Sequence, residues 1–132
     1  MTSESASSHQ TTAEFSIDLV PGDGLLESTG RFDFTKTWSG GMQGVMLSAG
    51  DPQTGNAGYV ALEVFDGTID GRPGQVALHQ FGTMNQGDYE LRYELVPGSG
   101  TAELTGITGA IDLVIDAGTH RVTLNYDLGQ VA

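Results

Sequence analysis

The sequence predicts an all-β fold in which eight short strands close into an antiparallel barrel, and three observations support this prediction. The chain contains 20 glycines, many of them beside aspartate, asparagine or proline, and such clusters form tight turns. The segments between the clusters are rich in the strand-forming residues Val, Ile, Leu, Phe, Tyr and Thr. Apolar and polar residues alternate along these segments with a period of two, and no long window shows a helical period.

Each of the first four predicted strands ends at a glycine-bearing turn. The strands lie at residues 13–20, 28–38, 41–49 and 57–69. The turns are Pro21–Gly24, Gly40–Gly41, Asp51–Asn56 and Asp70–Gly74. The fourth strand is apolar on both faces, with Tyr59, Ala61 and Phe65 on one and Val60, Leu62 and Val64 on the other. Such a strand contacts something outside the barrel as well as the lumen, so we expect homo-oligomerisation, with a terminal segment as the alternative cover.

The last four strands are predicted at residues 74–84, 87–96, 101–116 and 119–128, with a break near Gly106–Gly109 in the third of them. Alternation is clearest in the second, where Tyr89, Leu91, Tyr93 and Leu95 alternate with Glu90, Arg92 and Glu94. Successive hairpins fit a barrel or a sandwich, and we favour the barrel because closure removes exposed edges. Eight strands leave a lumen that side chains fill or line around one small ligand.

Length and charge limit the classes of function. The 132 residues suffice for one domain, predicted at 13–132, and the polar residues 1–12 are predicted to form a disordered tail. The net charge of −12 excludes a nucleic-acid binder and disfavours anionic membranes. The absence of cysteine excludes disulfides and thiolate metal sites. No secretory signal or membrane span is recognisable, so the expected location is the cytoplasm.

Two blocks of the chain resemble a known family. They are Gly58–Thr68 with Gly71, Arg72, Gly74 and Phe81–Met84, and Val96–Gly109. Over roughly residues 30–128 the chain resembles a small bacterial family of unknown function in the allene oxide cyclase-like superfamily. The turn with Gly106 and Gly109 is also similar to a stretch of plant allene oxide cyclases and dirigent proteins. Where relatives commonly read Leu-Gln-His, this chain has Leu78-His79-Gln80, which moves the imidazole to the opposite strand face.

The resemblance implies a closed eight-stranded antiparallel barrel, often oligomeric, whose lumen binds an apolar small molecule and steers an isomerisation or cyclisation. No polar lumen residue of the superfamily aligns with a local motif here, so none is carried over. The function that we predict is therefore cofactor-free isomerisation or cyclisation of an apolar molecule in the lumen. The alternatives are a carrier that does not catalyse and a structural oligomer whose lumen is plugged.

Glu63 and Gln80 are the candidate catalytic residues. Glu63 lies in an apolar strand, and a dry lumen would raise its pKa and suit it to acid–base catalysis. Gln80 shares the more apolar face of its strand and could donate a hydrogen bond to a ligand oxygen. The alternative for Glu63 is an exposed position at a rim or interface. The alternative for Gln80 is a partner for another buried polar group.

Four aromatic residues are candidate ligand-binding residues: Trp38, Tyr59, Tyr93 and Tyr126. Each could instead pack in the core. The three histidines, His9, His79 and His120, have no spacing typical of a metal site. We therefore predict no metal and no cofactor.

Overall fold

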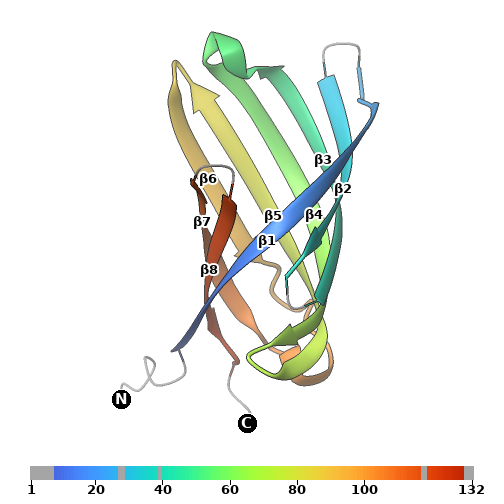
Figure 1. Ribbon diagram of the computed structural model, residues 1–132, viewed down its shortest axis with the longest axis vertical. Helices are drawn as coiled ribbons and strands as arrows, with labels where there is room; N and C mark the ends of the chain where they lie inside the picture. Colours follow the sequence, from blue (N-terminus) through green and yellow to red (C-terminus); the bar gives the residue numbers. More distant parts are fainter. Residues whose placement is uncertain (1–7, 27–28, 39, 117–118, 130–132) are drawn as a thin grey trace.

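The computed structural model describes residues 8–26, 29–38, 40–116 and 119–129 and shows a closed antiparallel barrel (Figure 1). Each strand pairs with the next along the chain, and the last pairs with the first. The predicted all-β barrel is confirmed. The strands are β1 (Ser8–Asp23), β2 (Thr29–Thr37), β3 (Gly40–Asp51), β4 (Asn56–Ile69), β5 (Arg72–Asn85), β6 (Asp88–Leu95), β7 (Thr108–Asp116) and β8 (Thr119–Asp127).

The longest strand, β1, runs diagonally across the barrel and pairs with two neighbours (Figure 1). Residues 8–15 pair with β8, and residues 16–23 pair with β2. The strand thus includes residues 8–12, which we expected in the disordered tail, while residues 1–7 lie outside the described residues. Polar cross-strand pairs explain the difference, because Gln10 donates to Asn125 over 2.9 Å and Thr12 lies 3.2 Å from Thr123.

The connection from β6 to β7 closes the lower end of the barrel. We expected residues 101–116 to be a strand, but β7 begins only at Thr108. A short 3₁₀ helix at Ala102–Leu104 replaces the first half, held by the Leu104 amide bonding to the Thr101 carbonyl. This turn drives Leu104 and Ile107 into the lumen, where both are fully buried. Burial of these two side chains outweighs the strand propensity of the segment.

The lower half of the lumen is a packed core. It holds inward side chains of successive strands together with the two residues from the β6–β7 connection. The members are Trp38, Met42, Phe65, Ile69, Val76, Leu78, Tyr93, Leu95, Leu104, Ile107, Ile111, Val122, Leu124 and Tyr126. Above it, β3, β4 and β5 extend beyond the upper ends of β7 and β8 (Figure 1). The upper half of the lumen therefore has walls of unequal height.

The outer face of β3 to β5 carries apolar side chains that no described residue covers. Val60 and Leu62 are 56% and 57% exposed, and Val45, Val64 and Phe81 are also exposed. The register places Val45 beside Leu62, and Val60 beside Phe81. We call this group, with the half-buried Leu47, the outer apolar patch. Its presence fits the two-faced apolar pattern of the fourth predicted strand.

Among the described residues, no helix has the length and apolar character needed to cross a membrane.

Candidate functional site

The upper half of the lumen contains a cavity of about 260 Å³ to which every strand contributes at least one side chain. Its wall is mainly apolar and includes the polar side chains of Lys36 and Gln80. The lining residues are Phe15, Ile17, Leu19, Phe34, Lys36, Met46, Tyr59, Gln80, Tyr89, Leu113 and His120. A second cavity of about 370 Å³ shares Met46, Tyr59 and Tyr89 with it and extends along the inner face of β3 to β5.

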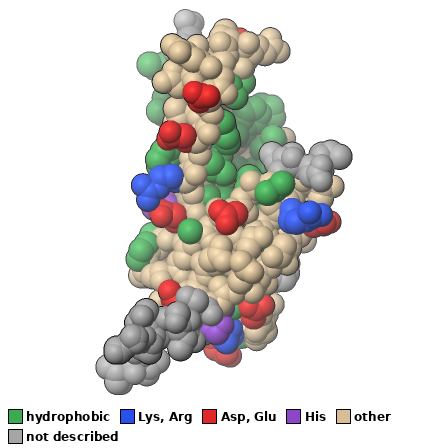
Figure 2. All heavy atoms as spheres, turned by 90° about the vertical axis from the view of Figure 1, so that its left-hand side faces the viewer, with side chains coloured by type: hydrophobic (Ala, Val, Ile, Leu, Met, Phe, Trp, Pro, Cys, Tyr) green, Lys and Arg blue, Asp and Glu red, His purple; other side chains and the backbone are tan. Residues whose placement is uncertain are grey.

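The seam between β6 and β7 has few backbone pairs, and β7 and β8 end below the tops of β3 to β5 on this side (Figure 1). Glu94 and Ala110 form the one register pair between these strands in the described part of the chain. Every other neighbouring pair of strands shares eight or more such pairs. Figure 2 faces this side and shows hydrophobic side chains gathered in its upper half. The chamber is thus closed below and accessible from above.

Lys36, on β2, reaches the lower end of this cavity. It is the only lysine of the chain, and it is just 5% exposed. Its Nζ lies 4.9 Å from the ring centre of Phe15, 5.1 Å from that of Phe34 and 5.2 Å from that of Tyr93. The aromatic rings shield the amine from water on several sides. A buried lysine is rare unless it has a partner.

That partner is Glu63, which is 1% exposed and lies behind Lys36 on β4. Nζ of Lys36 is 3.0 Å from Oε2 of Glu63 and donates to Oε1 over 3.4 Å. The Tyr93 hydroxyl donates to the same Oε1 and accepts from Nζ over 3.1 Å. Oε2 has no aligned donor among the described residues, despite its short contact with Nζ. The three side chains form one buried polar group, which we call the lysine triad.

Gly44 on β3 makes room for the lysine triad. The register places Gly44 between Phe34 on β2 and Glu63 on β4. A Cβ on Gly44 would lie 2.5 Å from Cζ of Phe34 and 2.7 Å from Cβ of Glu63. A side chain at this position would therefore displace the ring or the carboxyl group.

Burial raises the pKa of Glu63 above its ordinary value, and the nearby Lys36 opposes this shift without cancelling it. Desolvation penalises the charged carboxylate, whereas the ammonium group stabilises it. A raised carboxyl pKa next to a buried amine favours transfer of the shared proton toward the carboxyl group.

A second polar pair faces the cavity above the lysine triad. The Tyr59 hydroxyl donates to Oε1 of Gln80 over 2.8 Å, and Gln80 is 9% exposed. Burial, followed by a hydrogen bond with Tyr89, raises the pKa of Tyr59. Tyr59 therefore stays a neutral donor. Gly82 makes room for both tyrosines. A Cβ at this position would lie 2.5 Å from the Tyr59 ring and 2.9 Å from the Tyr89 hydroxyl.

The six predicted site residues separate into two groups. Glu63, Gln80, Tyr59 and Tyr93 lie at or directly behind the cavity. Trp38 and Tyr126 lie in the lower core, where the Trp38 ring packs at 5.7 Å against that of Phe65. The Tyr126 hydroxyl donates to Asp70 over 2.5 Å and accepts from Arg72 over 3.2 Å. Neither Trp38 nor Tyr126 lines the cavity.

Sequence reasoning missed Lys36, Phe15, Phe34 and Met46. The sequence contains a signal for Lys36, because Lys36 shares one face of its strand with Phe32, Phe34 and Trp38. A single lysine on an otherwise aromatic face predicts a charged group that points inward.

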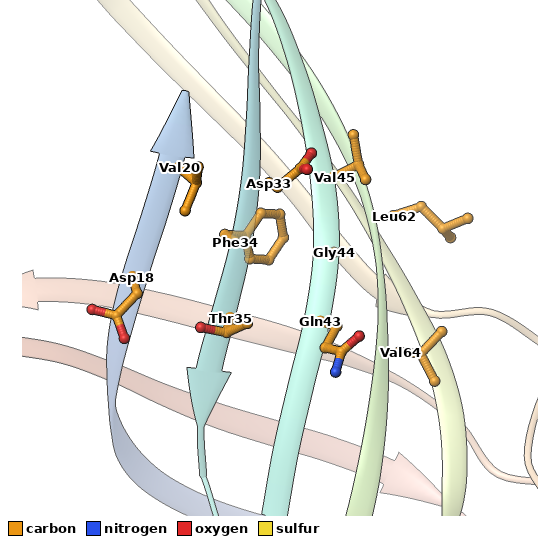
Figure 3. Close-up of a pocket in the computed structure, with 10 residues that line it drawn as sticks. All are labelled: Asp18, Val20, Asp33, Phe34, Thr35, Gln43, Gly44, Val45, Leu62 and Val64. Carbon is orange, nitrogen blue, oxygen red and sulfur yellow. The ribbon is translucent and has the colours of Figure 1, made fainter. Parts of the chain in front are cut away.

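A larger depression of about 500 Å³ lies on the outer surface over β1 to β4 (Figure 3). Apolar members of its lining include Val20, Val45, Leu62 and Val64. Its charged members, Asp18 and Asp33, are exposed, so water screens their charges. The depression therefore has the character of an interaction surface rather than a reaction site.

In the described part of the chain, no group of three or more histidine, aspartate or glutamate side chains could hold a metal ion.

Comparisons with known proteins agree on one family. A sequence model described as "Protein of unknown function (DUF3224)" matches residues 11–126. The chain is also similar to the crystal structure of a protein of unknown function from the DUF3224 family of Shewanella oneidensis MR-1. The two share 34% identity with a TM-score of 0.86, over 95% of this chain and 99% of the other. No curated protein matches the sequence.

Proposed function

We propose that this chain, which belongs to the DUF3224 family, binds an apolar small molecule in the upper lumen and promotes its isomerisation or cyclisation without a cofactor. One observation carries the proposal: the upper lumen is an apolar chamber whose wall includes the buried polar side chains of Lys36 and Gln80. Apolar walls supply affinity, and a few placed polar groups fix orientation, which is the usual composition of a small-molecule site.

The polar groups have distinct roles in this proposal. Lys36 and Gln80 line the cavity and contact the ligand, whereas Glu63 lies behind Lys36 and acts through it. The chamber holds a flexible ligand in one conformation, so that proximity and orientation lower the barrier. The resemblance to allene oxide cyclase-like barrels, given above, supports a rearrangement rather than hydrolysis or redox chemistry.

Two alternatives use the same barrel. A carrier would bind the ligand without changing it, and a structural oligomer would need no ligand. The packed lower lumen fits the structural alternative, whereas the chamber above it fits a ligand. Glu63→Gln separates the enzyme from the carrier, because a carrier keeps binding and has no turnover to lose.

A fluorescent apolar probe tests the binding proposal. We expect N-phenyl-1-naphthylamine to bind one site with increased fluorescence, and Met46→Trp to weaken binding by about tenfold or more because the indole fills the chamber. Val114→Trp, on the exposed outer face of β7, is the matched control and keeps wild-type affinity. Equal binding by both variants, with both folded by circular dichroism, would contradict the proposal.

We propose a second copy of the chain as the partner that covers the outer apolar patch. Monomers rarely leave a contiguous apolar surface of this kind exposed. A two-fold axis parallel to the strands would lay the β1–β2 flank of one copy on the β5–β6 flank of the other. The first flank carries Asp18, Asp33 and Arg31, and the second carries His79, Arg92 and Glu94. The second flank also carries the exposed Glu90, so both flanks are net negative, and the apolar side chains between them would drive the association.

A further inference from the structure

We infer that Lys36 forms an imine with an apolar aldehyde or ketone bound in the upper lumen. The inference rests on the proposed function, and it names the ligand class and the covalent step. Three observations carry it: the only lysine of the chain is buried, it lines the cavity, and its amine contacts a carboxyl group and a phenol.

The position of Lys36 argues against an ordinary structural role. A solubilising lysine lies on the surface, and this chain places its only lysine in the lumen instead. Leucine or methionine would fill the same space without desolvating a charge. A desolvated lysine in an apolar pocket is the usual form of an amine nucleophile, because loss of water favours the neutral amine.

The amine must lose a proton before it can attack, and the carboxyl group of Glu63 is placed to accept that proton. Oε2 of Glu63 lies 3.0 Å from Nζ and has no aligned donor among the described residues. When the shared proton resides on Oε2, that oxygen donates to the lone pair of Nζ, and both groups are neutral. This arrangement satisfies the unpaired oxygen and places an acid beside the amine.

The covalent step balances without an oxidant or reductant. The Nζ lone pair attacks the carbonyl carbon, and the carbonyl oxygen takes a proton from nitrogen to give a carbinolamine. Glu63 then protonates the hydroxyl group, the C–O bond breaks, and water leaves as nitrogen forms the C=N bond. The products are an iminium ion, a Glu63 carboxylate and one water molecule.

The surroundings stabilise these products. The iminium charge replaces the ammonium charge among the rings of Phe15, Phe34 and Tyr93, whose faces attract cations. The new carboxylate of Glu63 remains beside it and accepts from Tyr93. An iminium ion acidifies the neighbouring C–H bond, which gives the proposed isomerisation a route without a cofactor.

Reductive trapping with decanal and cyanoborohydride tests the inference. We expect the intact protein to gain the mass of one decyl group, and peptide mapping to place this group on Lys36 rather than on the terminal amine. Lys36→Arg keeps a cation beside Glu63 but cannot form this imine, so it should lose the adduct. Propanal should react more slowly than decanal, because the shorter chain fills less of the chamber.

An exposed lysine provides the matched control for reactivity. The double variant Lys36→Arg, Arg92→Lys moves the only lysine to the outer face of β6. We expect Lys36 in the wild-type protein to react at least about tenfold faster with decanal than this exposed lysine. Equal rates would overturn the inference.

Displacement of the fluorescent probe by decanal separates the two possible failures. If decanal displaces the probe but Lys36 gains no adduct, the chamber binds apolar carbonyl compounds and the imine is wrong. If neither probe nor decanal binds the folded protein, the proposed function fails and the inference fails with it.

Discussion

Lys36 and Glu63 show how a barrel can bury two ionisable groups. Each would be costly alone, since an unpaired buried charge destabilises a fold by several kcal/mol, roughly 3–5 in typical cases. Together they need only one shared proton, and Tyr93 supplies a further hydrogen bond. Replacing either partner leaves the other without compensation. Glu63 and Lys36 are therefore coupled in stability as well as in the proposed chemistry.

The raised pKa of Glu63 predicts a pH dependence of stability. The folded state binds this proton more tightly than the unfolded chain, whose carboxyl pKa is near 4.5. The stabilisation is complete below that pH and is lost as the pH rises through the folded-state pKa. We therefore expect the stability advantage of wild type over Glu63→Gln, measured by urea unfolding, to shrink from about pH 4 to about pH 8.

Glu90→Gln is the matched control, because Glu90 is exposed on β6. Its stability difference from wild type should vary much less over the same pH range. An advantage over Glu63→Gln that grows with pH would show that Glu63 is an ordinary ion-paired carboxylate.

The sequence predicts which face a residue occupies but not its height in the lumen. Alternation placed Gln80 on an inward face, and Gln80, Trp38 and Tyr126 are all buried. Their depth depends on the register of neighbouring strands, which one strand cannot reveal. Trp38 and Tyr126 therefore point inward in the closed half, away from the cavity. The contact between Lys36 and Glu63 could not be predicted for the same reason, because it crosses from β2 to β4.

At the scale of elements, the β6–β7 connection fills the lower half of the lumen and leaves the chamber above it. The sequence predicts a strand here because Leu104 and Ile107, on either side of Gly106, are residues that strands accept. The tertiary structure uses the same residues as a plug, because the lower end of the barrel needs apolar cover. Such long-range burial is invisible to a pattern of local alternation. The hairpins between the other strands, in contrast, were predictable from their turn residues.

Leu104→Ala tests the division into halves. Leu104 is 0% exposed, so its truncation should lower the free energy of unfolding by about 2–5 kcal/mol. Probe affinity of the folded variant should stay near that of wild type, because Leu104 does not line the chamber. Leu26→Ala, at a position that is 71% exposed, should change stability by less than about 0.5 kcal/mol. Loss of probe binding in folded Leu104→Ala would contradict separate halves.

At the scale of the whole molecule, the barrel has an apolar chamber inside and an apolar patch outside. The two surfaces belong to the same strands, because β4 faces the lumen with Tyr59 and Glu63 and the exterior with Val60 and Leu62. A ligand and a second copy would therefore contact opposite faces of one sheet. Changes on the outer face can be made without entering the chamber.

Leu62→Glu tests the proposed association. We expect the wild-type protein to sediment as a dimer and Leu62→Glu as a monomer, because the new charge would be buried against an apolar surface. Val114→Glu introduces the same charge at an exposed position on β7, outside the patch, and should leave the dimer intact. Probe binding should survive in both variants. A monomeric wild-type protein would refute the association.

The pairing of β1 with β8 has a consequence for biosynthesis. Closure of the ring requires residues 8–15 to find residues 120–127, which are among the last described residues to be translated. Until then any sheet that the nascent chain forms has two unpaired edges, and contacts of such long sequence separation form slowly. The finished barrel can arise only after residue 127 leaves the ribosome, so the early sheet is the stage most exposed to misassembly.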